Sequence, residues 1–160
     1  MSRAPYQVLV LPFRRTTRGT PEYAVLRRSD DGRWQGVAGG GHRGESPGDA
    51  AIREAHEEAA LPSSCLYYAL QSVASIPRHN FAAHSEWPQD LYVVPEYAFA
   101  VDCGRAELAL SGEHSEHRWE TYDDAHALLH WNSNQVALWE LHERIRHDEL
   151  PQAFGPGSLR

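Results

Sequence analysis

The sequence predicts an α/β fold in which one mixed, partly antiparallel β-sheet lies between layers of helices. Three observations support this. Short apolar runs rich in β-branched and aromatic residues recur along the chain, an acidic segment of good helix formers interrupts them near residue 50, and an apolar stripe at helical spacing lies near the end. Strands combined with such helices bury both sheet faces under helical layers.

The strands are predicted from apolar runs that end at turn residues. They span residues 6–13, 22–27, 65–76 and 91–103. We expect the first to be a central strand and the second to pair with it as a hairpin. The third is long or bulged, and Pro95 forces a bulge or an edge position in the fourth. The polar segment 77–90 is a loop of a length that is usually functional or mobile.

The central helix is predicted over residues 47–59. Ser46 is a good N-cap, Pro47 suits the first helical position, and Asp49 completes a capping box with Ser46. Two later helices are also expected, a short one over residues 123–129 and a final one capped by Ser133 or Asn132.

Three glutamates share one face of the central helix. Glu54, Glu57 and Glu58 have the spacing i, i+3, i+4. Like charges at this spacing repel by about 0.2–0.5 kcal/mol per pair on an exposed helix, so a cation among the carboxylates explains the cluster most simply. Oxygen-only ligands indicate Mg²⁺ or Mn²⁺. The alternative is a solvated helix face, which is the more frequent explanation for two adjacent glutamates alone.

An ion pair is expected to hold the preceding loop against this helix. Arg53 lies on the helix, and Glu45 ends the glycine-rich turn of residues 39–44. A guanidinium group can hold a carboxylate with two parallel hydrogen bonds, so this pair would fix the turn.

These residues together resemble the signature of the Nudix hydrolases. Gly39 is followed after five residues by Glu45, and after seven more by the run REAHEEAAL, which begins at Arg53. That family carries Gly, Glu, Arg, Glu, Glu and Glu at these spacings. Two positions depart from the pattern: Ala60 replaces a glycine, and Ala55 replaces a bulky aliphatic residue. We expect Ala60 to remove the option of a positive φ at the helix end, and Ala55 to make a smaller core contact.

The resemblance implies a Nudix-type α/β/α sandwich and metal-dependent hydrolysis of a pyrophosphate bond, with Mg²⁺ or Mn²⁺ as cofactor. It implies that Glu54, Glu57 and Glu58 bind metal and carry catalysis, and it leaves open which glutamate is the base. It further implies that the backbone carbonyl of Ala38 binds metal. Structural roles are implied for Gly39, Glu45 and Arg53.

A late metal ligand is expected in the segment EHSEHRW. In Nudix relatives a glutamate in this region faces the helix from a loop. Glu113, six residues before Trp119, is the first choice, and Glu116 is the second. His114 and His117 raise zinc as an alternative. No cysteine lies near them and the helix offers only carboxylates, so a hard ion is favoured.

Arginines are the candidate substrate contacts. The resemblance implies that Arg27 and Arg28 face the phosphates, with a solvated strand end as an equal alternative. Arg78 is a candidate in the loop of residues 77–90, where a plain surface residue is the more frequent outcome. The segment from residue 113 to 137 also resembles bacterial dihydroneopterin triphosphate pyrophosphatases, which take nucleoside triphosphates too. ADP-ribose, dinucleoside polyphosphates and a Nudix-fold sensing module without catalysis remain alternatives.

Composition sets the remaining expectations. The 160 residues carry a formal net charge of −7, which argues against a nucleic-acid partner. No signal peptide or membrane-length apolar run is evident, and Cys65 and Cys103 suggest buried thiols rather than a disulfide, so we expect a cytoplasmic protein. Residues 1–150 form one domain and residues 151–160 a flexible tail. The partner is a small pyrophosphate-containing molecule, and the oligomeric state is open, with a homodimer among the alternatives.

Overall fold

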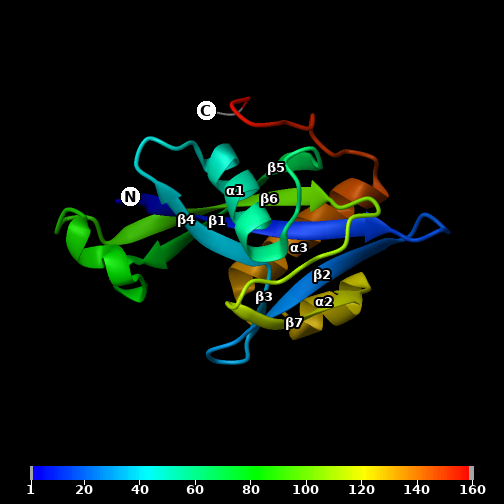
Figure 1. The fold of residues 1–160 in the computed structure, drawn as a ribbon, viewed down its shortest axis with the longest axis horizontal. Coiled ribbons are helices and arrows are strands. Elements are labelled where there is room, and N and C mark those ends of the chain that lie inside the picture. Colours follow the sequence, from blue (N-terminus) through cyan, green and yellow to red (C-terminus); the bar gives the residue numbers. More distant parts are fainter. Residues whose placement is uncertain (1, 159–160) are drawn as a thin grey trace.

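One mixed β-sheet with helices on both faces makes up the computed structural model, which describes residues 2–158 (Figure 1). The strands are β1 (Arg3–Arg15), β2 (Pro21–Arg28), β3 (Trp34–Gln35), β4 (Val37–His42), β5 (Leu66–Pro77), β6 (Val93–Asp102) and β7 (His114–Glu120). The helices are α1 (Pro47–Ala59), α2 (Tyr122–Leu128) and α3 (Asn132–Arg146), with the 3₁₀ helices η1 (Arg78–Asn80) and η2 (Ala82–Glu86). The predicted fold class is confirmed.

Strand β1 is the centre of the sheet, as predicted. It pairs in parallel with β6 along one edge, and antiparallel with β2 and then β4 along the other. Strand β2 pairs in turn with β3 and β7, and β5 pairs with the outer edge of β6. Pairing between β1 and β6 begins at Glu96, so Pro95 lies where β6 has only β5 as a neighbour. That edge position accommodates a residue without a backbone N–H.

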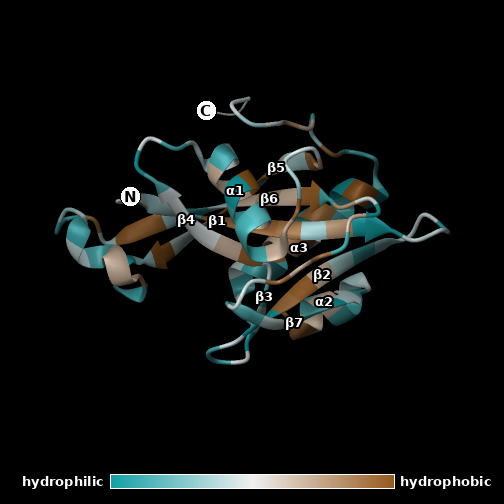
Figure 2. Ribbon diagram, viewed as in Figure 1, coloured by the Kyte–Doolittle hydropathy of each residue, from teal (hydrophilic) through white to brown (hydrophobic). Residues whose placement is uncertain are grey.

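Alternate residues of β1 fill two different cores. Val8 and Val10 belong to the cluster around α1, whereas Leu9 and Leu11 belong to the cluster around α2 and α3. All four are buried, and each full burial of such a side chain stabilises the fold by about 1.5–3 kcal/mol. Figure 2 shows the brown apolar strands between more polar helix surfaces and loops. The alternation explains why the sheet needs helices on both sides.

Helix α1 has the predicted bounds and the predicted N-cap, but Asp49 in its first turn and Ala60 at its end differ from the prediction. Ser46 accepts the backbone N–H of Asp49 at 3.2 Å, as an N-cap should. The Asp49 carboxylate accepts the N–H of Gly157 at 2.8 Å, so the structure gives it a tertiary contact. At the other end Ala60 takes the left-handed conformation, with φ of 57° and ψ of 26°. The expectation that alanine removes this geometry was wrong. Ala60 adopts the left-handed conformation despite its steric cost to a residue with a Cβ atom.

Phe154 contacts the sheet within the segment predicted to be a flexible tail, and residues 159 and 160 fall outside the described range. Phe154 is buried in the α1 core, and its backbone N–H donates to the Tyr67 carbonyl at 2.9 Å. The aromatic ring meets Phe99 edge-on at 5.7 Å between centroids. The two prolines and two glycines of this segment favoured a flexible tail. The buried aromatic side chain of Phe154 instead anchors it.

Three smaller expectations also changed. Trp131 precedes the first residue of α3 without a side-chain cap, so neither Ser133 nor Asn132 is the N-cap. Most of the polar loop 77–90 forms η1 and η2. Both cysteines are free thiols, but only Cys103 is fully buried. Within residues 2–158, no helix has the length and apolar character needed to cross a membrane.

Replacing Ala60 by glycine is expected to stabilise the protein. An L-residue in the left-handed region costs roughly 1–2 kcal/mol, and part of the gain is offset by the greater freedom of glycine in the unfolded chain. We expect Ala60→Gly to raise the free energy of unfolding by about 0.5–1 kcal/mol, measured by urea denaturation. Ala59→Gly is the matched control: position 59 is helical, so the same change should destabilise the protein. A lower free energy of unfolding in Ala60→Gly would contradict the proposed conformational cost at Ala60.

Candidate active site

Arg53 is the organising side chain of the site. Its guanidinium donates to both carboxylate oxygens of Glu45, at 2.9 and 3.0 Å. It also donates to the Gly40 carbonyl at 2.8 Å and to the Glu54 carboxylate at 2.9 Å. Glu45 in turn accepts the His42 N–H at 3.0 Å. The predicted ion pair is present, and it ties the glycine-rich turn to α1.

Gly39 lies directly over Glu54. A methyl group added at Gly39 would overlap the Glu54 carboxyl group, so only glycine leaves space for it. Burial raises the pKa of Glu54, against the lowering effect of Arg53, and the charges of Glu57 and Glu113 act in the same direction as burial. The strand therefore positions a sheltered carboxyl group between a guanidinium and other acids.

Glu58 is the most buried acid of the helix, at 3% exposure. Its Oε2 accepts the backbone N–H of Ala38 at 3.1 Å. Burial, a hydrogen bond with Glu113 and the charge of Glu54 together raise the pKa of Glu58 to about 10. Glu113 directly precedes β7, so a residue remote in sequence reaches the helix carboxylates. The arrangement concentrates negative charge where water provides little screening.

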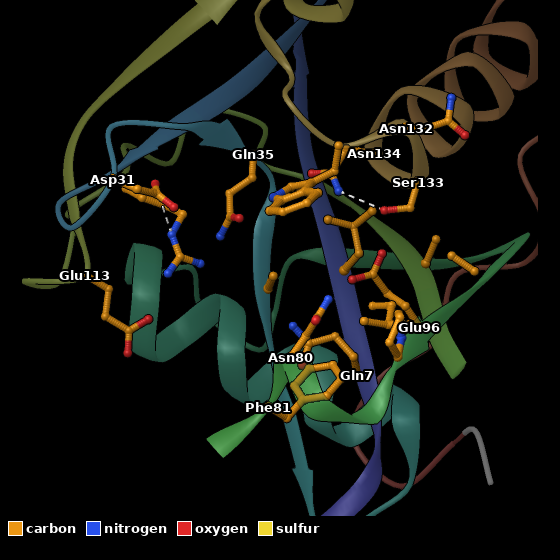
Figure 3. Close-up of a pocket in the computed structure, with 18 of the residues that line it drawn as sticks. Gln7, Asp31, Gln35, Asn80, Phe81, Glu96, Glu113, Asn132, Ser133 and Asn134 are labelled. Carbon is orange, nitrogen blue, oxygen red and sulfur yellow. Dashed lines mark hydrogen bonds and ion pairs between the residues drawn. The ribbon is translucent and has the colours of Figure 1, made fainter. Parts of the chain in front are cut away.

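Glu113 lines one end of a large cleft of about 1450 Å³ on the side of the sheet opposite α1, whereas Glu54, Glu57 and Glu58 do not line it. Ala38 and Glu113 line its end near the helix, and Glu96 and Asn134 line its far wall. Figure 3 shows Glu113 beside α1, with Glu96 and Asn134 on the opposite side. A molecule in the cleft can therefore contact the acidic cluster at one end and a polar wall at the other.

Known proteins share this architecture. The NUDIX domain family matches residues 5–139 of the chain. A NUDIX hydrolase of Listeria monocytogenes is 43% identical, with a TM-score of 0.83 over 92% of this chain and 98% of its own. The dihydroneopterin triphosphate pyrophosphohydrolase of E. coli is 23% identical, with a TM-score of 0.72 over 90% of this chain and 99% of its own. An Ap4A hydrolase of C. elegans is 17% identical, with a TM-score of 0.70 over 90% and 99%.

The chain belongs to the NUDIX hydrolase family. NUDIX hydrolases act on pyrophosphate bonds, which confirms the predicted enzyme class. Small nucleotide-type molecules are the substrates of the family. The relatives below 25% identity share the fold and leave the substrate of this enzyme to be inferred from its own residues.

The predicted acids of this NUDIX hydrolase separate into two groups. Glu54, Glu58 and Glu113 influence one another electrostatically, as described above. Glu57 has an exposed side chain and binds Arg53 at 3.1 Å, at the edge of the group. Glu116 lies in β7 rather than on a loop and pairs with Arg27 at 3.4 Å. Of the two candidates for the late acid, Glu113 is therefore the one that acts on the acids of α1.

The donor set fits a hard divalent cation. Its members are carboxylates and the backbone carbonyl of Ala38, all oxygen donors, and a cation would offset the mutual repulsion that raises the Glu58 pKa. Among residues 2–158, no three His, Cys, Asp or Glu side chains already lie in metal-binding geometry. The reason is visible in the contacts, since Glu57 binds Arg53 and Glu58 binds the Ala38 N–H.

Only one of the three predicted substrate arginines lines the cleft. Arg28 does so, while it also pairs with Asp30 and Asp31. Arg27 binds Glu116 and the Gly32 carbonyl, and Arg78 donates to the Pro88 carbonyl at 2.7 Å. Neither of these two lines the cleft, so the expectation for Arg27 and Arg78 is not supported.

Sequence reasoning missed several cleft residues. Arg3 is the clearest case: it crosses the face of Gly40, donates to Gln7 and lies 5.0 Å from the ring centroid of Phe81. Burial lowers the pKa of Arg3, and the charge of Glu54 partly offsets this effect. Gln7 and Glu96 were also missed, because their places within apolar strand patterns suggested only strand residues. The available signal was a polar residue within each of these two apolar strands, since Gln7 and Glu96 are paired neighbours in the sheet.

Gly39→Ala is expected to impair the NUDIX reaction. The new methyl group must displace the Glu54 carboxyl group, and a shift of about 1 Å in a catalytic group can cost on the order of 100-fold in rate. We expect kcat/KM to fall roughly 10- to 100-fold. Gly155→Ala is the control, because no atom lies within 4 Å of its added methyl group and its φ is not positive. Unchanged kcat/KM in folded Gly39→Ala would show that Glu54 need not occupy this place.

Proposed function

We propose that this enzyme hydrolyses a pyrophosphate bond in a nucleoside-diphosphate-linked substrate or in a nucleoside or pteridine triphosphate, with Mg²⁺ or Mn²⁺. One observation carries the proposal: Glu113, which lines the end of the cleft, acts on Glu54 and Glu58, and burial and like charge raise the Glu58 pKa. Strongly perturbed carboxyl groups beside a cleft are typical of functional sites.

The residues divide the work by position. Glu54, Glu57, Glu58 and Glu113, with the Ala38 carbonyl, would hold the cation. Bound Mg²⁺ or Mn²⁺ would neutralise phosphate charge and make a water molecule more acidic. The proton of the attacking water passes to a carboxylate of this cluster, which lies at the reacting end of the cleft. The water adds to phosphorus as the bridging oxygen leaves. A triphosphate yields an organic monophosphate and pyrophosphate, and a diphosphate-linked substrate yields a nucleoside monophosphate and the phosphate ester of the linked group.

Arg53 acts as a positioning residue in this proposal. It binds Glu45, the Gly40 carbonyl and Glu54, so it holds strand, turn and helix in one arrangement. Arg28 lines the cleft and offers a cation for phosphate oxygens at the end near Glu113. Its ion pairs with Asp30 and Asp31 are exposed and therefore weak, so the guanidinium can exchange them for a substrate phosphate.

Glu58→Gln tests the proposed reaction. The wild type should release an organic monophosphate from at least one of four substrate classes with Mg²⁺ or Mn²⁺, namely nucleoside triphosphates, dihydroneopterin triphosphate, ADP-ribose and dinucleoside polyphosphates. Chelation of the metal should abolish this release. Glutamine keeps the shape and the Ala38 contact of Glu58 but removes its charge, so we expect kcat to fall by roughly 100-fold or more. Glu107→Gln, an exposed change outside the cleft, is the control. Wild-type kcat in Glu58→Gln contradicts the assignment.

A comparison of Glu113→Gln with Glu116→Gln tests the choice of the late acid. Glu113 acts on Glu54 and Glu58, whereas Glu116 binds Arg27 at an exposed strand position. We expect Glu113→Gln to raise the Mg²⁺ concentration needed for half-maximal rate by roughly 10- to 100-fold. Glu116→Gln should leave that concentration within about twofold, because an exposed ion pair contributes little. The reverse ranking assigns the role to Glu116.

A further inference from the structure

The far wall of the cleft contains a carboxyl group that the proposed hydrolysis does not use. Glu96 is 6% exposed, lines the cleft, and its Oε1 is buried without a hydrogen-bond partner. A buried acceptor without a partner costs about 1–3 kcal/mol, so its persistence needs a reason. Figure 3 shows Glu96, Ser133 and Asn134 on the same wall of the cleft. A ligand that donates hydrogen bonds there would remove the deficit.

A chain of hydrogen bonds fixes Glu96 as an acceptor. The buried Asn134 accepts the Gly36 N–H at 2.9 Å through Oδ1, so its amide NH₂ points away and donates to Ser133 Oγ at 3.3 Å. The Ser133 proton is then free for Glu96. Burial raises the pKa of Glu96, and hydrogen bonding from Ser133 partly offsets this by favouring the carboxylate. The unpartnered oxygen therefore faces the cleft as an acceptor.

Gln7 supplies the complementary donor. It lies opposite Glu96 in the parallel register of β1 and β6. Arg3 donates to Gln7 Oε1 at 2.6 Å, and since a guanidinium has no acceptor, the Gln7 amide NH₂ is left to donate. Gln7 also lines the cleft. The carboxylate of Glu96, with one oxygen unpartnered, thus lies beside one amide donor.

We propose that Glu96 and Gln7 recognise the edge that guanine and pterin rings share, a ring N–H between an exocyclic NH₂ and a carbonyl. The two N–H donors suit a carboxylate, and the carbonyl suits the Gln7 amide. Adenine and cytosine place an acceptor beside their amino group, so they match this pattern less well. Phe81 and Trp131 line the same cleft and offer flat surfaces for a ring.

The position across the sheet agrees with a phosphorylated substrate. Glu96 pairs with Gln7, and Gln7 pairs with Gly40, so Glu96 is two strands away from the glycine strand that covers Glu54. Strands lie about 4.8 Å apart, which gives a separation of about 10 Å. A ring at Glu96 can therefore carry a phosphate chain to the acidic cluster. The inference rests on the proposed function for this placement of the phosphates.

The test uses GMP and IMP, which differ only in the exocyclic amino group. Neither contains a pyrophosphate bond, so their binding, measured by calorimetry with Mg²⁺, does not depend on hydrolysis. The wild type should bind GMP roughly 10- to 100-fold more tightly than IMP. Glu96→Gln should lose most of this preference and weaken IMP binding less than GMP binding, because IMP offers the carboxylate only the ring N–H. Glu107→Gln should retain it. Equal wild-type affinities, or an unchanged preference in Glu96→Gln, overturn the inference.

Two further arms keep the outcome decisive. Gln7→Met, which keeps the side-chain length, should also weaken GMP binding. It replaces Glu96→Gln as the test if the Glu96→Gln variant does not fold. Guanosine and neopterin, both without phosphate, identify which ring is bound. If neither compound binds, the inference is overturned. Hydrolysis of ATP without a GMP preference refutes only this inference. A Glu96-dependent GMP preference without any hydrolysis refutes only the proposed reaction.

Discussion

The fork of Arg53 is the interaction on which the site depends. One guanidinium binds the Glu45 carboxylate with two hydrogen bonds and also reaches the Gly40 carbonyl and Glu54. Its side chain is only 21% exposed, so these bonds are poorly screened by water. Several acids crowd this small region, and their repulsion would otherwise open the turn and the helix face. A lysine could not replace it, because an ammonium lacks the planar fork.

The glycines of β4 extend this constraint to both faces of the sheet. Gly39 leaves space for the Glu54 carboxyl group on the α1 side, and Gly40 leaves space for Arg3 on the cleft side. Arg3 then orients Gln7, which neighbours Glu96. The glycine run of this short strand therefore connects the acidic cluster and the far wall of the cleft. This is why side-chain-free positions are needed beyond the turn itself.

Local residues made part of this structure predictable. Helix α1 has the predicted bounds and the predicted N-cap Ser46, and β1 contains its predicted apolar run. The ion pair between Arg53 and Glu45 was predictable because both residues belong to one segment. The far wall of the cleft was not predictable from the sequence, because Glu96 and Asn134 come together only when β6 and α3 pack in the folded protein. Asn134 had looked like part of a helix start, yet it binds Gly36 across 98 positions of sequence.

The acidic cluster and the far wall of the cleft depend on different helices. Helix α1 holds the acidic cluster, whereas α3 supplies Ser133 and Asn134 beside Glu96. Helix α3 also fixes the irregular part of β5 through Glu140, whose carboxylate accepts the backbone N–H groups of Gln71 and Ser72 at 2.7 and 2.8 Å. Burial alone would raise the pKa of Glu140, but these bonds and Arg144 together lower it, so its charge is retained.

Because Ser72 lines the cleft, this anchor sets the shape of the far wall without touching the acids of α1. Substitutions at distant sites with no shared partners are close to additive in free energy. Changes at the far wall should therefore alter which ring is accepted, while changes on α1 alter the rate for every substrate. A fold in which one helix holds the reacting end and another shapes the recognition wall can change its substrate without rebuilding its chemistry.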